Sequence, residues 1–359
     1  GKTSMQAAFD VTIRGGTIVT ADQEPLRADL GITNGRIVAM APTLPRGTTD
    51  HNATGLFILP GGVDSHCHVE PRLGTTDAFF AASVAAVCGG STTLVLFASQ
   101  RHGERIMDAF NAYCRAAANC ACDYAVHVIV SDLSVPHAAE DLANLFDAGC
   151  RSTKVRLSQE ALDGLAQDQI LDLLALCRTH GALLRMDAES DDLVAWLTRR
   201  LHQAGLMASR YQALAHPALT EREGTRRAIG LAELTGTPLL VGPISTAAAM
   251  EEIVSARQRG VPVFATTNTE HLIITHTPQP IDLVDPAHTP RAAADRMTLW
   301  QCLADGTLHV VASAHSMARG GGMLQPRATA MALAESSRGD PEWERGDPEW
   351  ERGDPEWER

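Results

Sequence analysis

From Leu56 onward, short apolar runs alternate with helical stretches, and this alternation restricts the fold more than any other feature of the chain. Strands joined by helices run parallel, so eight such units predict an α/β fold, a (β/α)8 (TIM) barrel. A doubly wound open sheet is the alternative architecture. The predicted strands are 57–63, 92–97, 124–130, 152–157, 182–187, 238–244, 261–267 and 308–313, and the predicted helices are 77–88, 104–118, 138–148, 167–180, 191–204, 221–235, 246–259 and 291–305.

A segment with the alternating pattern of β-strands precedes the predicted barrel. Residues 9–56 alternate apolar and polar positions, and Asn34-Gly35 between two such runs is a strong hairpin signal. Gly15-Gly16 lies between two further runs of this kind, 11–14 and 17–20. The pattern predicts a small antiparallel β-sheet module of the β-sandwich type ahead of a barrel domain over 57–335.

Both ends of the chain differ from these domains. Residues 1–8 read as a tag-like or disordered start that lacks the apolar core of a signal peptide. From Gly339, the sequence Gly-Asp-Pro-Glu-Trp-Glu-Arg occurs three times, and its glycine and proline argue against a coiled coil. We expect 336–359 to be a disordered acidic tail, natural or engineered, without a catalytic role.

Charge and cysteine usage exclude several classes of protein. The formal net charge of −13 argues against a nucleic-acid-binding surface, which would be basic. The chain contains no run of 18 or more apolar residues, so we expect no membrane span. Its eight cysteines show no Cys-x-x-Cys spacing and are too few for a disulfide scaffold, which predicts a cytoplasmic protein.

The first predicted barrel strand carries a His-x-His pair, His66 and His68, behind the apolar run 56–59. Residues two positions apart in a strand point to the same face, so these two imidazoles can bind one metal ion. The alternative is a pair of hydrogen-bonded or surface histidines. The Gly-Gly turn before the strand and the barrel context favour the metal site.

Lys154 is an unusual residue in the fourth predicted strand. A buried lysine is costly unless it is paired or modified. Arg156 lies on the same face by alternation, so the pattern alone favours an outward or rim position for Lys154.

Taken in order along the chain, these features resemble the cyclic amidohydrolases, specifically the dihydropyrimidinase and hydantoinase branch of the amidohydrolase superfamily. The resemblance extends over 9–318 and is most specific at 59–68, the segment that contains the two histidines. The other segments that carry it are 13–19, 29–32, 35–39, 53–55, 89–93, 228–236, 303–307 and 310–313.

The resemblance changes the expected role of Lys154. It implies a two-metal site bridged by a carboxylated lysine, where a metal-bound hydroxide attacks the ring carbonyl. Lys154 corresponds to that lysine, and His66 and His68 correspond to the ligands of the first strand. An aspartate at the end of strand eight is implied as the general base.

The chain departs from the family pattern at three strand ends. Asp187 and Pro243 stand where the family has histidines, and Ala314 stands where it has the catalytic aspartate. Alanine and proline neither coordinate a metal nor transfer a proton, whereas zinc accepts a carboxylate oxygen. We therefore assign no catalytic base, and Glu270, His271 and His216 are candidate replacements without a predicted position.

These departures lead us to expect one divalent metal ion, zinc in the simplest case, in place of two, or no metal at all. The expected ligands are His66, His68, Lys154 and Asp187.

Two functions remain open at this point. The first is a metal-dependent hydrolase that opens a cyclic amide such as a dihydropyrimidine, a hydantoin or a related imide. The second is a catalytically impaired pseudo-hydantoinase that acts in binding or assembly. The expected partner is the small cyclic amide, with no nucleic acid and no membrane, and the resemblance implies a homo-oligomer.

Overall fold

The computed structural model describes residues 7–69, 78–157, 164–187, 189–207, 209–274 and 291–316. The predicted tail over 336–359 and most of the predicted start over 1–8 lie outside them. The chain divides into two compact units between Gly62 and Val63, whereas the sequence places this division at 56. Among the helices of the described ranges, none is long and apolar enough to cross a membrane.

The first unit is a five-stranded sheet in the order β3-β2-β1-β4, with β5 also paired to β1. Asn34 and Gly35 have φ of 51° and 71°, as a two-residue hairpin turn requires, which confirms the predicted hairpin. One detail of the prediction is wrong: β4 and β5 run parallel to β1. β1 itself continues through Gly15-Gly16, where its pairing with β2 shifts register. The strands are β1 (Val11–Ile18), β2 (Leu26–Thr33), β3 (Arg36–Ala41), β4 (Thr49–Asn52) and β5 (Phe57–Ile58).

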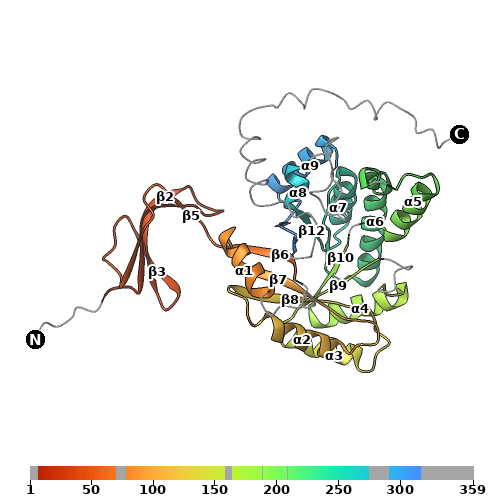
Figure 1. Cartoon of the computed structure of the whole chain (residues 1–359), viewed down its shortest axis with the longest axis horizontal. Coiled ribbons are helices and arrows are strands. Elements are labelled where there is room, and N and C mark those ends of the chain that lie inside the picture. Colours follow the sequence, from red (N-terminus) through yellow and green to blue (C-terminus); the bar gives the residue numbers. More distant parts are fainter. Residues whose placement is uncertain are drawn as a thin grey trace, which may run out of the picture. The chain divides into compact units, whose positions relative to one another are not determined.

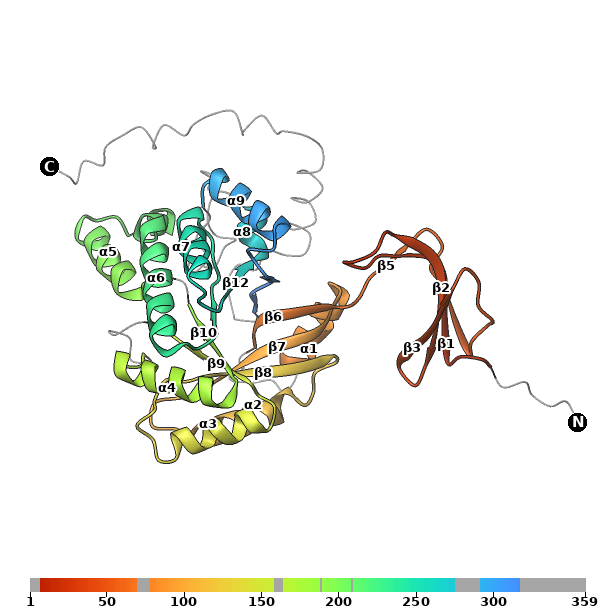
Figure 2. The same cartoon turned by 180° about the vertical axis from the view of Figure 1, so that it is seen from behind.

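The second unit confirms the predicted (β/α)8 barrel, with parallel strands inside and helices outside (Figures 1 and 2). Its eighth strand is broken at Ser313-Ala314. The segment before the break, β13, pairs with β12, and the segment after it, β14, pairs with β6, so the broken strand closes the ring. The strands are β6 (Gly62–His68), β7 (Ser91–Ser99), β8 (Asp123–Ile129), β9 (Ser152–Val155), β10 (Leu183–Met186), β11 (Leu239–Val241), β12 (Val263–Asn268), β13 (Val310–Ala312) and β14 (His315–Ser316).

The first barrel strand begins later than predicted. Phe57–Ile58 pairs with β1 of the N-terminal sheet and takes no part in the barrel, whose first strand is Gly62–His68. His66 and His68 therefore lie within the barrel strand, on one face of it.

The eight predicted helices occur in the predicted order. Gly181 and Gly236 end α4 and α6 in the left-handed conformation that favours glycine. The sequence pattern missed two short elements, a 3-10 helix over Ser209–Ala215 and α8. The helices are α1 (Ala78–Cys88), α2 (Ile106–Ala117), α3 (Ala138–Asp147), α4 (Gln167–His180), α5 (Asp191–Gln203), α6 (Ala218–Thr235), α7 (Ala247–Gln258), α8 (Thr269–Ile273) and α9 (Ala293–Ala304).

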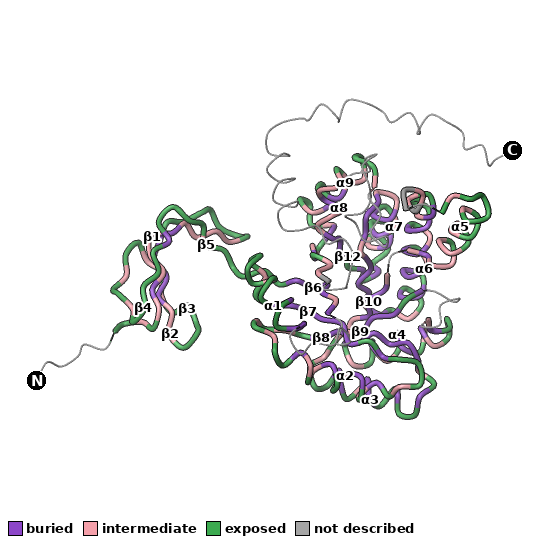
Figure 3. Tube along the Cα trace, viewed as in Figure 1, coloured by how far each residue is buried: buried purple, intermediate pink, exposed green. Residues whose placement is uncertain are grey.

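The main hydrophobic core lies between the barrel strands and the helices around them. Leu184 and Leu239 from the strands and Leu142, Leu174 and Ile253 from the helices are fully buried in it. Figure 3 shows the buried stretches along the barrel strands and the inner sides of the helices. Because strand residues alternate, the intervening side chains face the barrel interior, where the candidate site lies.

Candidate functional site

The two histidines of β6 point at each other inside the barrel. Their Nε2 atoms are 2.8 Å apart, and their ring centroids are 4.8 Å apart. His66 is buried, and His68 is half-buried. The strand alternation that predicts a shared face for the pair therefore holds, and the two imidazoles are in direct contact.

Arg185, on β10, is the residue of this site that sequence reasoning missed. It is 0% exposed, and its guanidinium donates to the backbone oxygen of Ser65 at 3.2 Å and to Nδ1 of His66 at 2.9 Å. Burial lowers the pKa of Arg185 to about 10, so it stays charged at neutral pH. The sequence feature that indicates it is a cationic residue within a short apolar strand, two positions before Asp187.

Lys154, on β9, is 4% exposed, so the outward or rim position favoured by the sequence pattern is wrong. Its Nζ lies 2.9 Å from Oδ1 of Asp187, which explains how the barrel interior accommodates an ammonium group. Burial lowers the pKa of Lys154, and the carboxylate of Asp187 partly offsets this. Burial acts to raise the pKa of Asp187, but the charges of Lys154 and Arg185 hold it below its ordinary value.

A phenyl ring, that of Phe97 on β7, lies among these groups. The rings of His68 and His127 stack on it with centroid distances of 4.6 Å and 5.1 Å. Lys154 Nζ and the Arg185 guanidinium carbon lie 5.1 Å and 5.4 Å from its centroid, which is cation–π distance. Phe97 therefore fills the space around which the predicted ligands gather.

His127, on β8, is a second buried histidine of the interior. Its Nδ1 contacts Oγ of Ser152, and its side chain is buried. Burial, followed by the charges of Arg185 and Lys154, lowers the pKa of His127 to about 3. His127 is therefore neutral at physiological pH.

Asp64 connects the first barrel strand to the break in the eighth. It is buried and accepts hydrogen bonds from the amide of Ser313 at 3.1 Å, from the Ser313 hydroxyl, and from the amide of His66 at 3.2 Å. Ala314, which follows Ser313 in the chain, has φ of 53°, in the left-handed region. The carboxylate thus fixes the turn at the position where the resemblance implies the catalytic aspartate.

We expect Asp64→Ala to destabilise the protein by about 1–3 kcal/mol, because buried donors would lose their acceptor. Urea unfolding measures this loss. Ser313→Ala removes one donor to Asp64 and leaves only the exposed amide of His315 without its acceptor, so it should cost clearly less. Equal losses for the two variants would contradict this role of the carboxylate.

The predicted ligands come together around Phe97, but their arrangement does not fit a metal ion. Arginine only donates hydrogen bonds, so Nδ1 of His66 accepts one, and the proton of the neutral ring is on Nε2. That proton occupies the position where a metal would bind. Lys154 is engaged with Asp187. Within the described ranges, no group of three or more His, Cys, Asp or Glu side chains could hold a metal ion.

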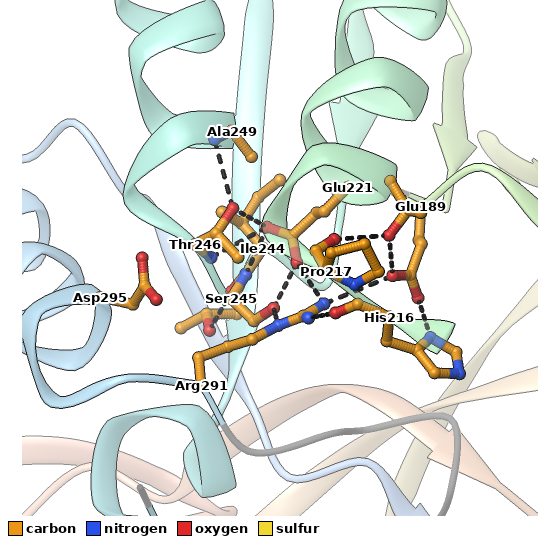
Figure 4. Close-up of polar contacts among 12 residues, drawn as sticks. Glu189, His216, Pro217, Glu221, Ile244, Ser245, Thr246, Ala249, Arg291 and Asp295 are labelled. Carbon is orange, nitrogen blue, oxygen red and sulfur yellow. Dashed lines mark hydrogen bonds and ion pairs between the residues drawn. The ribbon is translucent and has the colours of Figure 1, made fainter. Parts of the chain in front are cut away.

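A second polar cluster, which the sequence did not predict, lies where α6, α7 and the segment before α9 meet (Figure 4). Glu221 is 2% exposed and accepts hydrogen bonds from the amides of Ser245 and Thr246 at 2.8 Å and 2.9 Å. It also accepts from both hydroxyl groups, and Nη2 of Arg291 lies 3.3 Å from it.

Glu189 extends this cluster toward the end of β10. It accepts hydrogen bonds from Thr220 Oγ1 at 2.6 Å and from Arg291, and it pairs with Nδ1 of His216 at 2.7 Å. Burial acts to raise the pKa of Glu189, but His216 and Arg291 hold it below its ordinary value. His216, one of the candidate replacement bases, is therefore engaged in this cluster.

Comparisons with known proteins agree on one group of enzymes. No protein-family model matches the chain. The D-hydantoinase of Ralstonia pickettii is 34% identical over 320 residues, which are 86% of this chain and 69% of that protein. The dihydropyrimidinase of Arabidopsis thaliana is 33% identical over 271 residues, which are 74% of this chain and 50% of that protein. A solved D-hydantoinase structure matches with a TM-score of 0.79 and 33% identity, covering 86% of this chain and 69% of that one.

A (β/α)8 barrel with histidine, lysine and aspartate gathered inside it, together with these matches, defines the class of the protein as an amidohydrolase-type barrel. The chain belongs to the cyclic amidohydrolase family, in its hydantoinase and dihydropyrimidinase branch. The predicted family is thereby confirmed, and it is a family of enzymes.

Proposed function

We propose that this chain hydrolyses a small cyclic amide: a dihydropyrimidine, a hydantoin or a related imide. The observation that carries the proposal is the 34% identity to a D-hydantoinase over 86% of the chain. Hydrolysis adds water to the ring carbonyl and breaks the carbon–nitrogen bond. In a (β/α)8 barrel this chemistry belongs at the carboxyl ends of the strands, the end toward which Lys154, Asp187 and Ala314 are placed.

The described residues supply part of what this reaction needs. The ammonium of Lys154 pairs with Asp187 at 2.9 Å, but it has three N–H donors and would favour negative charge on a carbonyl oxygen through the others. Ala314, at the position of the implied general base, cannot accept a proton. Loss of a general base typically costs about 10²- to 10⁴-fold in rate, so we expect slow turnover.

A family member that binds the ring without opening it is the second candidate. Ala314 and Pro243 favour it, because neither can coordinate a metal or move a proton. The arrangement around His66 also favours it, because the donor set does not fit a metal. The zinc ion and the carboxylated Lys154 are not part of this proposal, because the donor set does not fit a metal and Lys154 pairs with Asp187 as an ammonium. The homo-oligomer and the cytoplasmic location stay predictions, and no step of the proposed function depends on them.

A ring-opening assay with dihydrouracil and hydantoin, with and without added zinc or manganese, tests the proposal. We expect slow hydrolysis by the wild type and a gain of about 100-fold or more for Ala314→Asp, which restores a base. Aspartate tolerates the left-handed backbone of this position. Ala314→Asn, with the same backbone preference and no base, should show no gain.

The outcomes separate the two candidates. No turnover of either ring by the wild type and by Ala314→Asp would reject the hydrolase. Calorimetric binding of an unopened ring would then support the second candidate.

A further inference from the structure

Arg185 reaches across the barrel interior from β10 to β6. It lies opposite Lys154 in the register of β9 and β10, so both cations face inward. Its guanidinium contacts the backbone oxygen of Ser65 and Nδ1 of His66, and its side chain is fully buried. Burying a charged side chain this deeply has a high desolvation cost. The contacts of Arg185 therefore indicate a specific role.

The contact with His66 has a defined direction. A guanidinium has five N–H donors and no acceptor, so the lone pair of His66 Nδ1 receives the hydrogen bond. A neutral imidazole carries one proton, which is then on Nε2. That proton points to Nε2 of His68 at 2.8 Å, whose lone pair accepts it. Nε2 of His66 is thus protonated, and the lone pair of His68 Nε2 accepts the hydrogen bond from it.

The charges of the interior lead to the same conclusion. Lys154 pairs with Asp187 at 2.9 Å, and Asp64 and Asp187 are the carboxylates whose charges act on Arg185. The exposed Arg156 adds a further positive charge that acts on Lys154 and Asp187, so the anions of this set do not outnumber its cations. A divalent ion would place two more positive charges beside Arg185.

We propose that Arg185 replaces a metal ion as the group that organises the His66–His68 pair. It fixes His66 in the tautomer that donates to His68 and thereby excludes a metal from the two nitrogens. Arg185 is a positioning residue, and it turns the predicted metal-binding motif into a hydrogen-bonded imidazole pair. This inference does not depend on the proposed function, because it concerns metal binding and not turnover.

Zinc titration of the full-length chain tests the proposal, with calorimetry and metal analysis after dialysis as readouts. We expect Arg185→Met to bind zinc at this site about 10- to 100-fold more tightly than the wild type. Adding His66→Ala to Arg185→Met should abolish that gain, which separates this site from other zinc-binding residues. Arg156→Met removes an exposed cation that follows β9 and acts on Lys154 and Asp187 through its charge alone. As the charge-matched control, it should show a clearly smaller gain than Arg185→Met.

Nitrogen-15 histidine NMR of the wild type gives a second test that needs no folded Arg185 variant. We expect the His66 signal, assigned by its loss in His66→Gln, to show the proton on Nε2 both without and with zinc. A proton on Nδ1 would overturn the proposal. So would wild-type zinc binding through His66 that is as tight as in Arg185→Met.

Discussion

Replacing Glu221 with alanine is expected to destabilise the protein by about 3–5 kcal/mol, the loss typical of breaking a buried charged network. The carboxylate is 2% exposed and accepts from the amides and hydroxyls of Ser245 and Thr246 as well as from Arg291. Thr246 also caps α7 through its bond to the amide of Ala249. Alanine would therefore leave the buried amides of Ser245 and Thr246 without their acceptor and would remove one of the acceptors of the Arg291 guanidinium.

Urea unfolding followed by circular dichroism measures this effect. Glu233→Ala is a matched control, because Glu233 lies on the same helix and pairs with Arg259 at the surface. Its unfolding midpoint should stay close to that of the wild type. Glu221→Gln retains one oxygen acceptor and should fall between the two. A midpoint for Glu221→Ala equal to that of Glu233→Ala would show that the cluster does not hold the helices together.

Acidification is expected to remove stability through His127. Its folded pKa is about 3, against an ordinary value of 6.5, so between these pH values the unfolded state binds a proton that the folded state does not. The contribution is fully present above pH 6.5 and is lost as the pH falls toward 3. A shift of this size corresponds to roughly 4–5 kcal/mol.

The free energy of unfolding as a function of pH, compared between the wild type and His127→Phe, isolates this contribution. The comparison is needed because Asp132 and Asp141, whose pKa values are also lowered, act in the same direction in both proteins. The variant should lose less stability between pH 6.5 and 4 than the wild type. Ser152→Ala, which removes the hydroxyl partner and keeps the imidazole, should retain the steep profile. Parallel profiles for the wild type and His127→Phe would contradict the prediction.

The periodicity of the sequence predicted the barrel because burial of strands and helices depends on local patterns. The apolar runs and the stretches between them correspond to the strands and helices of the structure, apart from the first strand. The run 56–59 was misassigned because a short apolar segment carries no information about its pairing partner, which proved to be β1. The same limit made Lys154 look like a rim residue, since its partner Asp187 is on another strand.

The shared face of His66 and His68 and the family follow from the sequence alone, because strand alternation and local motifs are properties of neighbouring residues. The tertiary structure decided what that pair does. Arg185 is 119 residues away in the chain and becomes a neighbour only when the barrel closes. Because the guanidinium only donates, its hydrogen bond to Nδ1 of His66 places the proton of that ring on Nε2. Neither strand segment, taken alone, predicts this hydrogen bond.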